Sequence, residues 1–527
     1  MDLTPEPHSS PRPGGLATAA LIIMAAFVLS RVLGLAREMV IGNLFGTTRE
    51  LDAYRAAFLL PDIIFQLIAG GALGSAFIPT FTGYIAKGRE DEAWRLASGV
   101  FNLALASLTA AALAVAALAD GLVPLVVPGF EPQAQHLTAQ LVRIMLFSPV
   151  LAGLSGIVMG ILNSYQHFTL PALAPVIYNL SIIGGAFALA PRWGVKGLAV
   201  SVAVGAGLHL LIQVPELLRR RLRYRPTFAL DHPGVREVGR LMLPRVVGLA
   251  AVQVNFLVNN ILASGLSAGR LSALTYAWQL TTLPWGIFAM AISTAVFPTL
   301  AAQVARDEKD ELGRTLSISL RTILYLTIPA GIGLLVLREP IIALLFQRGE
   351  FTPESTQLTA WALLFYAPGL FALAATEIIT RAFYALHDTR TPVTVAVITV
   401  ATNILLSIIL VRMLSQGGLA LAATIANTGE TVALVLLIRR RLAGIDEHGL
   451  ARSVARSLAA SLAMGLFLWW LSSTASIHLY LARFSGLFVF VTVAIALGGG
   501  LYLLLTLLLG SEEIRRIGAL RKAGSLK

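Results

Sequence analysis

About fourteen apolar segments, each roughly 20 to 30 residues long, follow one another along the 527-residue chain. Segments of this length can cross a bilayer as helices, and lipid accepts only helices or closed barrels because it offers the backbone no hydrogen-bond partners. The segments are too long and too uniform for the strands of a barrel. Only 13% of the residues are charged, against about 25% in soluble domains. The sequence therefore predicts an all-α integral membrane protein with about 14 transmembrane helices, near residues 16–44, 53–84, 94–119, 135–162, 170–190, 196–217, 238–264, 271–303, 314–337, 357–386, 392–412, 417–438, 453–474 and 484–509.

The net charge of +12 orients the chain in the membrane and does not indicate a nucleic-acid partner. Basic residues are concentrated in every second loop, and cytoplasmic loops are the ones that carry an excess of Lys and Arg. This rule places both termini in the cytoplasm, together with Lys87, Arg89, Arg219, Arg220, Arg221, Arg223, Arg225, Arg306, Lys309, Arg390, Arg439, Arg440 and Arg441. The absence of cysteine excludes disulfides and thiolate metal sites, and no histidines have the spacing of metal ligands.

The first twelve segments contain two copies of one six-segment unit. The same shift of 221 residues relates Phe130 to Phe351 and Pro171 to Pro392 (351 − 130 and 392 − 171). Because six is even, the second copy enters the membrane from the same side as the first, so the repeats are parallel. We expect two pseudo-symmetric six-helix lobes plus two C-terminal helices, divided as 1–15 (disordered cytoplasmic N-terminus), 16–217 (N-lobe), 218–237 (basic cytoplasmic linker), 238–441 (C-lobe), 442–510 (the two added helices) and 511–527 (cytoplasmic tail).

Two arginines lie inside the first apolar segment, in Ser30-Arg31-Val32-Leu33-Gly34-Leu35-Ala36-Arg37. An ionised side chain at bilayer depth is costly and is found where it faces a water-filled cavity or a partner. The pattern recurs at residues 243–250, where Arg245 aligns with Arg31. Arginines repeated in the two halves of a membrane chain indicate a binding site on a pseudo-symmetry axis. The alternatives are snorkelling toward the headgroups for Arg31 and Arg37, and a structural brace for Arg245.

Polar side chains near these arginines also have two interpretations each. Asp52 either caps the second helix at its N-terminus or pairs with a cavity arginine. Asn255 either hydrogen-bonds between helices or lines the cavity, and the cavity is favoured because its neighbours repeat the first-helix pattern. In the loop 388–392, we expect the side chains to set turn geometry and caps.

Several motifs resemble those of the MurJ (MviN) lipid II flippase family, within the multidrug/oligosaccharidyl-lipid/polysaccharide exporter superfamily. The most specific are Leu345-Phe346-Gln347-Arg348-Gly349-Glu350-Phe351-Thr352 and Phe383-Tyr384-Ala385-Leu386-His387-Asp388-Thr389-Arg390-Thr391-Pro392. Others are residues 31–37 followed by Asp52-Ala53-Tyr54, then Gly71-Ala72-Leu73, Ala76-Phe77-Ile78-Pro79 and Gly160-Ile161-Leu162-Asn163. Together these motifs extend over the first twelve segments.

The resemblance implies a V-shaped transporter with a central cationic cavity lined by helices 1, 2, 7 and 8, and a groove for a polyprenyl tail in the last two helices. The implied substrate is the undecaprenyl-pyrophosphate-linked peptidoglycan precursor, lipid II, moved from the inner to the outer leaflet of the bacterial cytoplasmic membrane by alternating access. Arginine suits this substrate because its planar fork binds phosphate oxygens at two points. No bond is made or broken, so we expect no enzyme activity and no cofactor. The expected partners are this precursor, membrane lipids and the cell-wall synthesis machinery.

The chain departs from the family at several positions. Family members carry cavity arginines where this chain has Phe65 and Gln279, and Arg55 and Arg245 are candidates to compensate. The acids of the family's sodium site match Asn259 and Ser407, beside Asn403, which argues against sodium coupling and leaves membrane-potential or proton coupling open. The expected substrate-binding residues are Arg31, Arg37, Arg245, Arg55, Asp52, Asn255 and Gln279.

Other functions remain as alternatives. An exporter of another polyprenyl-linked glycan would share the pyrophosphate end of the substrate, whereas a multidrug exporter should use acidic or aromatic sites for cations. A membrane glycosyltransferase or polymerase would need clustered acids on a sizeable loop, and no such loop is evident. A scaffold that does not transport would tolerate the loss of Arg31 and Arg37.

Overall fold

The computed structural model describes residues 13–70, 76–219, 223–442, 444–474 and 484–513. All regular elements within these ranges are helices, and each of the fourteen predicted segments coincides with one helix or with consecutive helices. The all-α prediction is therefore confirmed. Most of the expected disordered N-terminus and of the cytoplasmic tail lies outside the described residues, as does the Gly71-Ala72-Leu73 motif. The first helix begins at Pro13 and includes residues 13–15, which were expected to be disordered.

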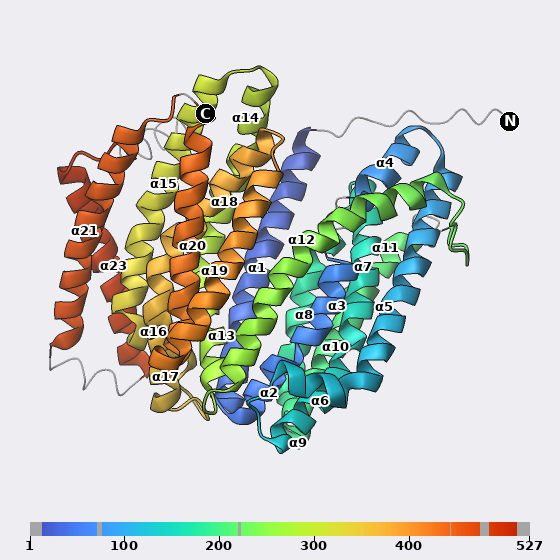
Figure 1. Ribbon diagram of the computed structural model, residues 1–527, viewed down its shortest axis with the longest axis horizontal. Helices are drawn as coiled ribbons and strands as arrows, with labels where there is room; N and C mark the ends of the chain where they lie inside the picture. The colour runs from blue at the N-terminus through green and yellow to red at the C-terminus, as the bar shows by residue number, and fades with distance from the viewer. Residues whose placement is uncertain (1–12, 71–75, 220–222, 443, 475–483, 514–527) are drawn as a thin grey trace. The chain divides into compact units, whose positions relative to one another are not determined.

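The chain divides into two compact units (Figure 1). The first unit comprises residues 1–41, 56–125 and 131–253. Its helices are most of α1 (Pro13–Phe45), α3 (Leu59–Ile68), α4 (Ile78–Ala86), α5 (Glu90–Val126), α6 (Pro132–Met145), α7 (Phe147–Ser164), α8 (Thr169–Ala188), α9 (Ala190–Trp193), α10 (Val195–Leu211), α11 (Val214–Arg219) and the first part of α12 (Pro233–Ser264).

The second unit comprises residues 42–55, 126–130 and 254–527. Its helices are α2 (Arg49–Ala57), the end of α12, α13 (Arg270–Pro284), η2 (Trp285–Ala289), α14 (Met290–Ala305), α15 (Lys309–Val336), α16 (Arg338–Phe346), α17 (Pro353–Tyr366), η3 (Ala367–Gly369), α18 (Leu370–Ala385), α19 (Arg390–Leu414), α20 (Gln416–Arg439), α21 (Glu447–Ser473) and α23 (Phe484–Leu508). The lobe boundaries expected from the repeat stay a prediction.

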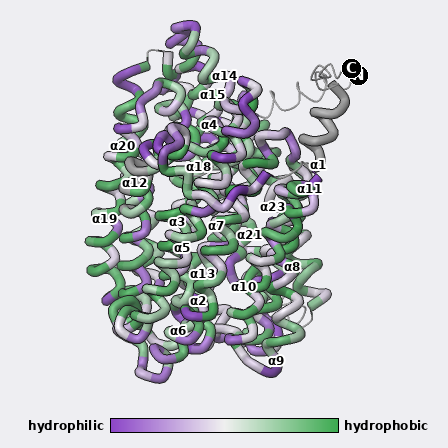
Figure 2. The backbone as a smooth tube through the Cα atoms, turned by 90° about the vertical axis from the view of Figure 1, so that its right-hand side faces the viewer, coloured by the Kyte–Doolittle hydropathy of each residue, from purple (hydrophilic) through white to green (hydrophobic). Residues whose placement is uncertain are grey.

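Eleven helical stretches among the described residues are long and apolar enough to cross a membrane. The other three predicted segments correspond to α1, to α2–α4 and to α12. Figure 2 shows that hydrophobic residues occupy the long helices and that hydrophilic residues gather at many of the turns between them. The chain is accordingly an integral membrane protein.

The internal repeat is visible in the elements themselves. Helices α6 and α17 are both 14 residues long, and their first residues, Pro132 and Pro353, are related by the shift found in the sequence (353 − 132). The phenylalanines that precede them, Phe130 and Phe351, are both buried. The duplicated architecture is therefore confirmed at the level of matching helices.

Several predicted segments are broken into two helices near a proline. Helix α2 ends at Ala57 and α3 starts two residues later, with Pro61 in its first turn; α6 and α7 are separated at Leu146, close to Pro149. Proline removes a backbone N–H and its ring clashes with the preceding turn, so breaks and kinks concentrate at these positions. In the second unit, the π-helical turn η2 follows Pro284. Hydrophobic length alone could not reveal these breaks.

The two C-terminal helices pack onto the second unit through α15. Tyr502 on α23 donates a hydrogen bond of 2.7 Å from its hydroxyl to the carbonyl of Tyr325 on α15. Buried Met464 and Leu468 of α21 join the same apolar cluster. At one end of the packing, the buried Arg321 of α15 forms an ion pair with Asp446, which caps α21 by accepting from the Gly449 amide. Helices α21 and α23 are therefore fixed to α15 by both apolar and charged contacts.

Candidate functional site

Arg37 is held in a defined conformation inside the first unit. Its guanidinium donates to the Glu38 carboxylate at 2.8 Å and to Asn179 Oδ1 on α8 at 3.1 Å. The Asn179 amide in turn donates to the carbonyls of Ser30 and Pro175. Glu38 is only 1% exposed, whereas the Arg37 side chain keeps 24% of its surface accessible. The structure therefore gives Arg37 a fixed orientation and leaves about a quarter of its side-chain surface accessible.

Arg31 and Arg245 are not brought into this network among the described residues. Arg31 is exposed, and its guanidinium lies 5.2 Å from the centre of the Phe27 ring. Arg245 lies on α12, and its side chain is outside the described residues. A chamber shared by Arg31 and Arg245 therefore stays a prediction.

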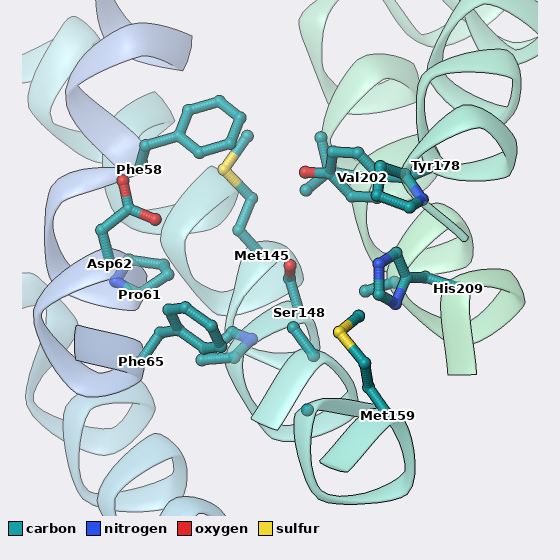
Figure 3. A pocket seen from close by; sticks show the side chains of 15 residues that line it. Phe58, Pro61, Asp62, Phe65, Met145, Ser148, Met159, Tyr178, Val202 and His209 are labelled. Atoms are coloured by element: carbon teal, nitrogen blue, oxygen red, sulfur yellow. The ribbon is translucent and has the colours of Figure 1, made fainter. Parts of the chain in front are cut away.

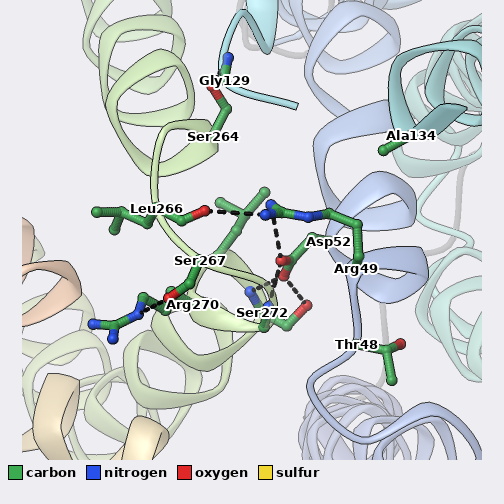
Figure 4. Close-up of polar contacts among 12 residues, drawn as sticks. Thr48, Arg49, Asp52, Gly129, Ala134, Ser264, Leu266, Ser267, Arg270 and Ser272 are labelled. Carbon is green, nitrogen blue, oxygen red and sulfur yellow. Dashed lines mark hydrogen bonds and ion pairs between the residues drawn. The ribbon is translucent and has the colours of Figure 1, made fainter. Parts of the chain in front are cut away.

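Asp52 is fully buried in the second unit and binds the start of α13 (Figure 4). Its Oδ2 accepts from the Gly269 amide at 2.6 Å, and its Oδ1 accepts from the Ser272 amide at 2.8 Å and hydroxyl at 2.7 Å. Arg49 lies 3.7 Å from the same carboxylate. Because helix N-termini leave amides without partners, a carboxylate at this place satisfies them and complements the helix dipole.

One of the two interpretations of Asp52 needs correction. Asp52 does not cap its own helix, because it lies in the first turn of α2 and caps α13, more than 200 residues later in the chain (269 − 52). The other interpretation, a partner for a cavity arginine, stays a prediction. Gly269 has φ +84°, and a side chain there would overlap the carbonyl of Thr47. Such a glycine brings α2 close to α13, a tertiary contact that local sequence rules cannot identify.

Arg55 and Gln279 are both associated with α13. The Arg55 guanidinium lies 5.2 Å from the centre of the Tyr276 ring, a cation–π geometry. Tyr276 is fully buried, and Gln279 follows it by three residues on the same helix. The half-buried side chain of Gln279 makes no hydrogen bond to any described residue. The structure thus brings Arg55 and α13 together in the second unit.

Amide and hydroxyl side chains form a polar cluster between α12 and α19. Asn259 donates to Asn255 Oδ1 at 3.3 Å and to Asn403 Oδ1 at 3.5 Å. The Ser407 hydroxyl is 3.4 Å from Asn259 Oδ1 and 3.3 Å from Asn403 Oδ1. Asn255 therefore contacts a neighbour on its own helix, and the cluster is neutral.

An apolar groove of about 630 Å³ lies against the C-terminal helices of the second unit. Helices η2, α15, α21 and α23 contribute its walls. The lining includes Leu326, Pro329, Met464, Leu468, Ile495 and Leu503. Its chemistry suits a hydrocarbon chain because it offers extensive apolar surface and few polar atoms.

The partners of Arg37 were not identified from the sequence. Glu38 had a detectable signal, because an acid inside the apolar segment 16–44 needs a compensating charge. Asn179 is separated from Arg37 by 142 residues, and its role depends on how α8 packs against α1. The only sequence feature that marks Asn179 as a possible partner is that it is a polar residue within an apolar segment.

Comparison with known protein families gives a consistent result. The model of the family described as "Lipid II flippase MurJ" matches residues 41–489. A probable lipid II flippase MurJ of Vibrio cholerae is 32% identical over 425 residues, which cover 78% of this chain and 80% of the relative. The lipid II flippase MurJ of Burkholderia cenocepacia is 32% identical over 437 residues, covering 80% and 84%. The resemblance found in the motifs is confirmed.

Solved structures show the same fold. A lipid II flippase MurJ in an inward closed conformation matches with a TM-score of 0.79 and 25% identity, covering 94% of this chain and 99% of that one. An inward-facing multidrug resistance transporter of the MATE family matches with a TM-score of 0.69 at 18% identity, covering 80% and 98%. The second similarity establishes a shared fold only.

Proposed function

The chain belongs to the lipid II flippase MurJ family, and we propose that it moves lipid II, the undecaprenyl-pyrophosphate-linked peptidoglycan precursor, across the membrane. The lipid passes from the inner to the outer leaflet of the bacterial cytoplasmic membrane by alternating access. The protein is a transporter and not an enzyme, since no bond is made or broken. Its work is to lower the barrier for a charged headgroup to cross an apolar layer.

The observation that carries this assignment to individual residues is the environment of Arg37. The Arg37 guanidinium is held by Glu38 and Asn179 within a predicted membrane-spanning segment, and 24% of the Arg37 side-chain surface is accessible. Arginine binds phosphate oxygens at two points, and a fixed side chain loses less entropy when it binds. We assign Arg37 to the pyrophosphate, with Arg31, Arg55, Arg245, Asp52, Asn255 and Gln279 as the further members of the substrate-binding set.

The apolar groove of the second unit is our candidate for the polyprenyl tail. Its volume of about 630 Å³ accommodates part of a long hydrocarbon chain. Burial of prenyl carbons contributes roughly 25 cal/mol to the binding free energy for each Å² of apolar surface removed from water. The contribution is smaller for a tail that enters the groove from lipid, because that surface is already out of water. The remainder of the tail stays in the bilayer.

The positions of the basic loops support a cytoplasmic location for both termini. Cell-wall synthesis enzymes that use the translocated lipid are the expected protein partners. Export of a different polyprenyl-linked glycan uses the same pyrophosphate chemistry, so headgroup specificity is a separate question. The family match favours neither that alternative nor multidrug export.

Complementation of a bacterial strain depleted of its own flippase tests the function directly. The wild-type chain should restore growth, and Arg37→Ala should abolish it while insertion into the membrane is unchanged. Arg37→Lys keeps the charge but loses the planar fork, so it should restore growth only partly. Exposed Arg192 on α9 provides a matched control, and Arg192→Ala should complement fully. Normal growth with Arg37→Ala would refute the assignment of this residue.

Gln279→Arg tests whether the cavity follows the family pattern. Family members carry an arginine at this position, and the side chain of Gln279 has space to be replaced because it is half-buried and forms no hydrogen bond to described residues. We expect equal or faster lipid II transport in reconstituted vesicles. A well-expressed but inactive Gln279→Arg protein would indicate a different headgroup.

A further inference from the structure

A second cavity, of about 440 Å³, lies entirely within the first unit. Helices α3, α6, α7, α8 and α10 contribute its walls, and all of them belong to predicted transmembrane segments. Most of the lining is apolar, including Phe58, Phe65, Met145, Met159 and Val202. Among this lining, Asp62, Tyr178 and His209 are titratable (Figure 3).

Asp62 projects from α3 into this cavity, and His209 lies on the opposite wall (Figure 3). The Asp62 carboxylate forms no hydrogen bond or ion pair with any described residue, although its main-chain carbonyl accepts from Gln253 at 3.3 Å. Asp62 is exposed and lines the cavity, and at membrane depth its carboxylate is more costly in the ionised form than in the protonated form.

Among the described side chains, none with a positive charge pairs with the Asp62 carboxylate. Helix α7 has no charged residue, and Arg143 of α6 bonds to Asp120 at 2.7 Å. His209 is held through Nδ1, which lies 2.7 Å from the Ser155 hydroxyl. Among the side chains that the structure describes, the charged and titratable groups near Asp62 include Tyr178 on α8, His209 on α10, and Arg37 and Glu38 on α1, both of which interact electrostatically with Tyr178.

A proton fits the cavity better than a metal ion does. Alkali and alkaline-earth cations require several oxygen ligands, whereas the side-chain oxygens of the lining are those of Asp62, Ser148 and Tyr178. A cavity of about 440 Å³ has room for water that can deliver a proton to the carboxylate.

Helix irregularities meet at this cavity. Pro61 of α3, Pro149 of α7 and Pro175 of α8 all line it. Each proline removes a hydrogen bond from its helix or from the helix start and favours bending there. A change of charge at Asp62 therefore acts where three helices of the unit are least constrained.

The same turn of α8 connects the cavity to Arg37. Tyr178 lines the cavity, and the next residue, Asn179, accepts the hydrogen bond from Arg37 at 3.1 Å. Asn179 also donates to the carbonyl of Pro175 at 3.0 Å. A displacement of α8 at the cavity would therefore move the group that orients Arg37.

We propose that this cavity is a proton-binding site that couples proton movement to lipid II transport. The Asp62 carboxylate takes a proton from cavity water and becomes a neutral acid, and it returns the proton to water when the unit changes conformation. His209 exchanges protons with the same water. Protonation repositions α3 and α8, and through Asn179 it changes the orientation of Arg37. The coupling to lipid II rests on the proposed function, whereas the proton site itself does not.

The proton site can be tested without lipid II. The full chain in lipid nanodiscs is titrated between about pH 5 and pH 8 and followed by infrared difference spectroscopy of the carboxylic acid C=O stretch. We expect a band in the wild type that is absent from Asp62→Asn and retained in Asp120→Asn. The control removes the Asp120 carboxylate, which accepts a hydrogen bond from Arg143 in the wild type. If Asp62→Asn does not fold, Asp62→Glu should shift the band. Retention of the band in Asp62→Asn, or an unshifted band in Asp62→Glu, would overturn the proposal.

Coupling is then measured as lipid II translocation in proteoliposomes over the same pH range. The wild-type rate should change by about tenfold, whereas Asp62→Asn should show one rate at every pH and bind lipid II with unchanged affinity. A wild-type pH profile in Asp62→Asn would overturn the coupling. If the wild type shows the Asp62 band but does not translocate lipid II, the proposed function is refuted and the proton site stands.

Discussion

At the scale of single residues, buried charges in this protein are held by groups that lie far away in the sequence. Asp52 satisfies two amides and a hydroxyl of α13, and Arg37 is oriented by Asn179 on α8. A buried donor that loses its acceptor costs about 1–3 kcal/mol. These contacts therefore contribute more than the surface ion pairs of the chain, each of which is worth about 0–1 kcal/mol.

Replacing Asp52 with alanine should destabilise the second unit. The Gly269 and Ser272 amides would lose their acceptor at the start of α13, and we expect a loss of about 2–3 kcal/mol. The measurement is the thermal unfolding midpoint of the detergent-solubilised protein. Glu50→Ala, two residues earlier in the same turn and exposed, should leave the midpoint unchanged; an unchanged midpoint in Asp52→Ala would show that the cap is dispensable.

Sequence reasoning predicted which charged residues matter better than it predicted their partners. Arg37 stands out because ionised residues are rare in apolar segments. Tertiary packing determines that Asn179 contacts Arg37 and that Asp52 caps α13. Local sequence patterns carry no information about this packing. The cavity around Asp62 was also missed, because an aspartate directly after a proline is equally consistent with the first turn of a helix.

At the scale of elements, long apolar segments located the helices, and prolines determined where they break. The fourteen predicted segments all fall on helices, since the bilayer thickness sets their length. The breaks between α2 and α3 and between α6 and α7 follow from Pro61 and Pro149. A proline can kink a helix or end it, and packing decides which of the two occurs.

The loop between α18 and α19 acts as a pH-dependent cap. Asp388 accepts from the Thr391 hydroxyl at 2.6 Å and amide at 3.0 Å, which confirms the capping role expected for this loop. These bonds and the nearby Arg441 hold the pKa of Asp388 below its ordinary value. A lowered pKa means that the ionised form stabilises the fold, so this stabilisation is present above about pH 4 and disappears as the pH falls through the lowered pKa.

We therefore expect Asp388→Asn to unfold at a lower temperature than the wild type near neutral pH. The difference should shrink as the pH falls below about 4, when the wild-type carboxylate becomes protonated. Thermal midpoints of both proteins measured across this range provide the test. Thr391→Val removes one of the donors and should show a smaller difference with the same sign. A difference that is independent of pH would contradict ionisation of Asp388 as the cause.

The charged contact between α15 and α21 has little room for change. A side chain at Gly449 would overlap the Arg321 guanidinium and the Asp446 carboxylate, whereas one at Gly429 on α20 would meet no atom within 4 Å. Alanine normally stabilises a helix interior relative to glycine, by roughly 1 kcal/mol. Gly429→Ala should therefore raise the unfolding midpoint slightly, and Gly449→Ala should lower it. Equal midpoints for the two variants would show that α21 is not held by this contact.

At the scale of the whole molecule, the chain contains a duplicated set of helices and divides into two compact units. The shift of 221 residues was visible in the sequence and is preserved in the bounds of α6 and α17. Duplication explains why arginines recur in both halves, but it does not fix their partners.

Transport by this protein should not depend on sodium. Asn259 and Ser407, where the resemblance led us to expect the family's sodium-site acids, form a neutral hydrogen-bonded cluster with Asn403. Neutral amides can donate as well as accept hydrogen bonds, so the cluster joins α12 to α19 through its own contacts and offers no net charge to a cation. We expect equal lipid II translocation in proteoliposomes when sodium is replaced by choline at constant ionic strength. Asn259→Asp should reintroduce a negative charge in this cluster and confer a measurable response to sodium; a wild-type rate that rises with sodium would show that the amides and the hydroxyl are sufficient to bind it.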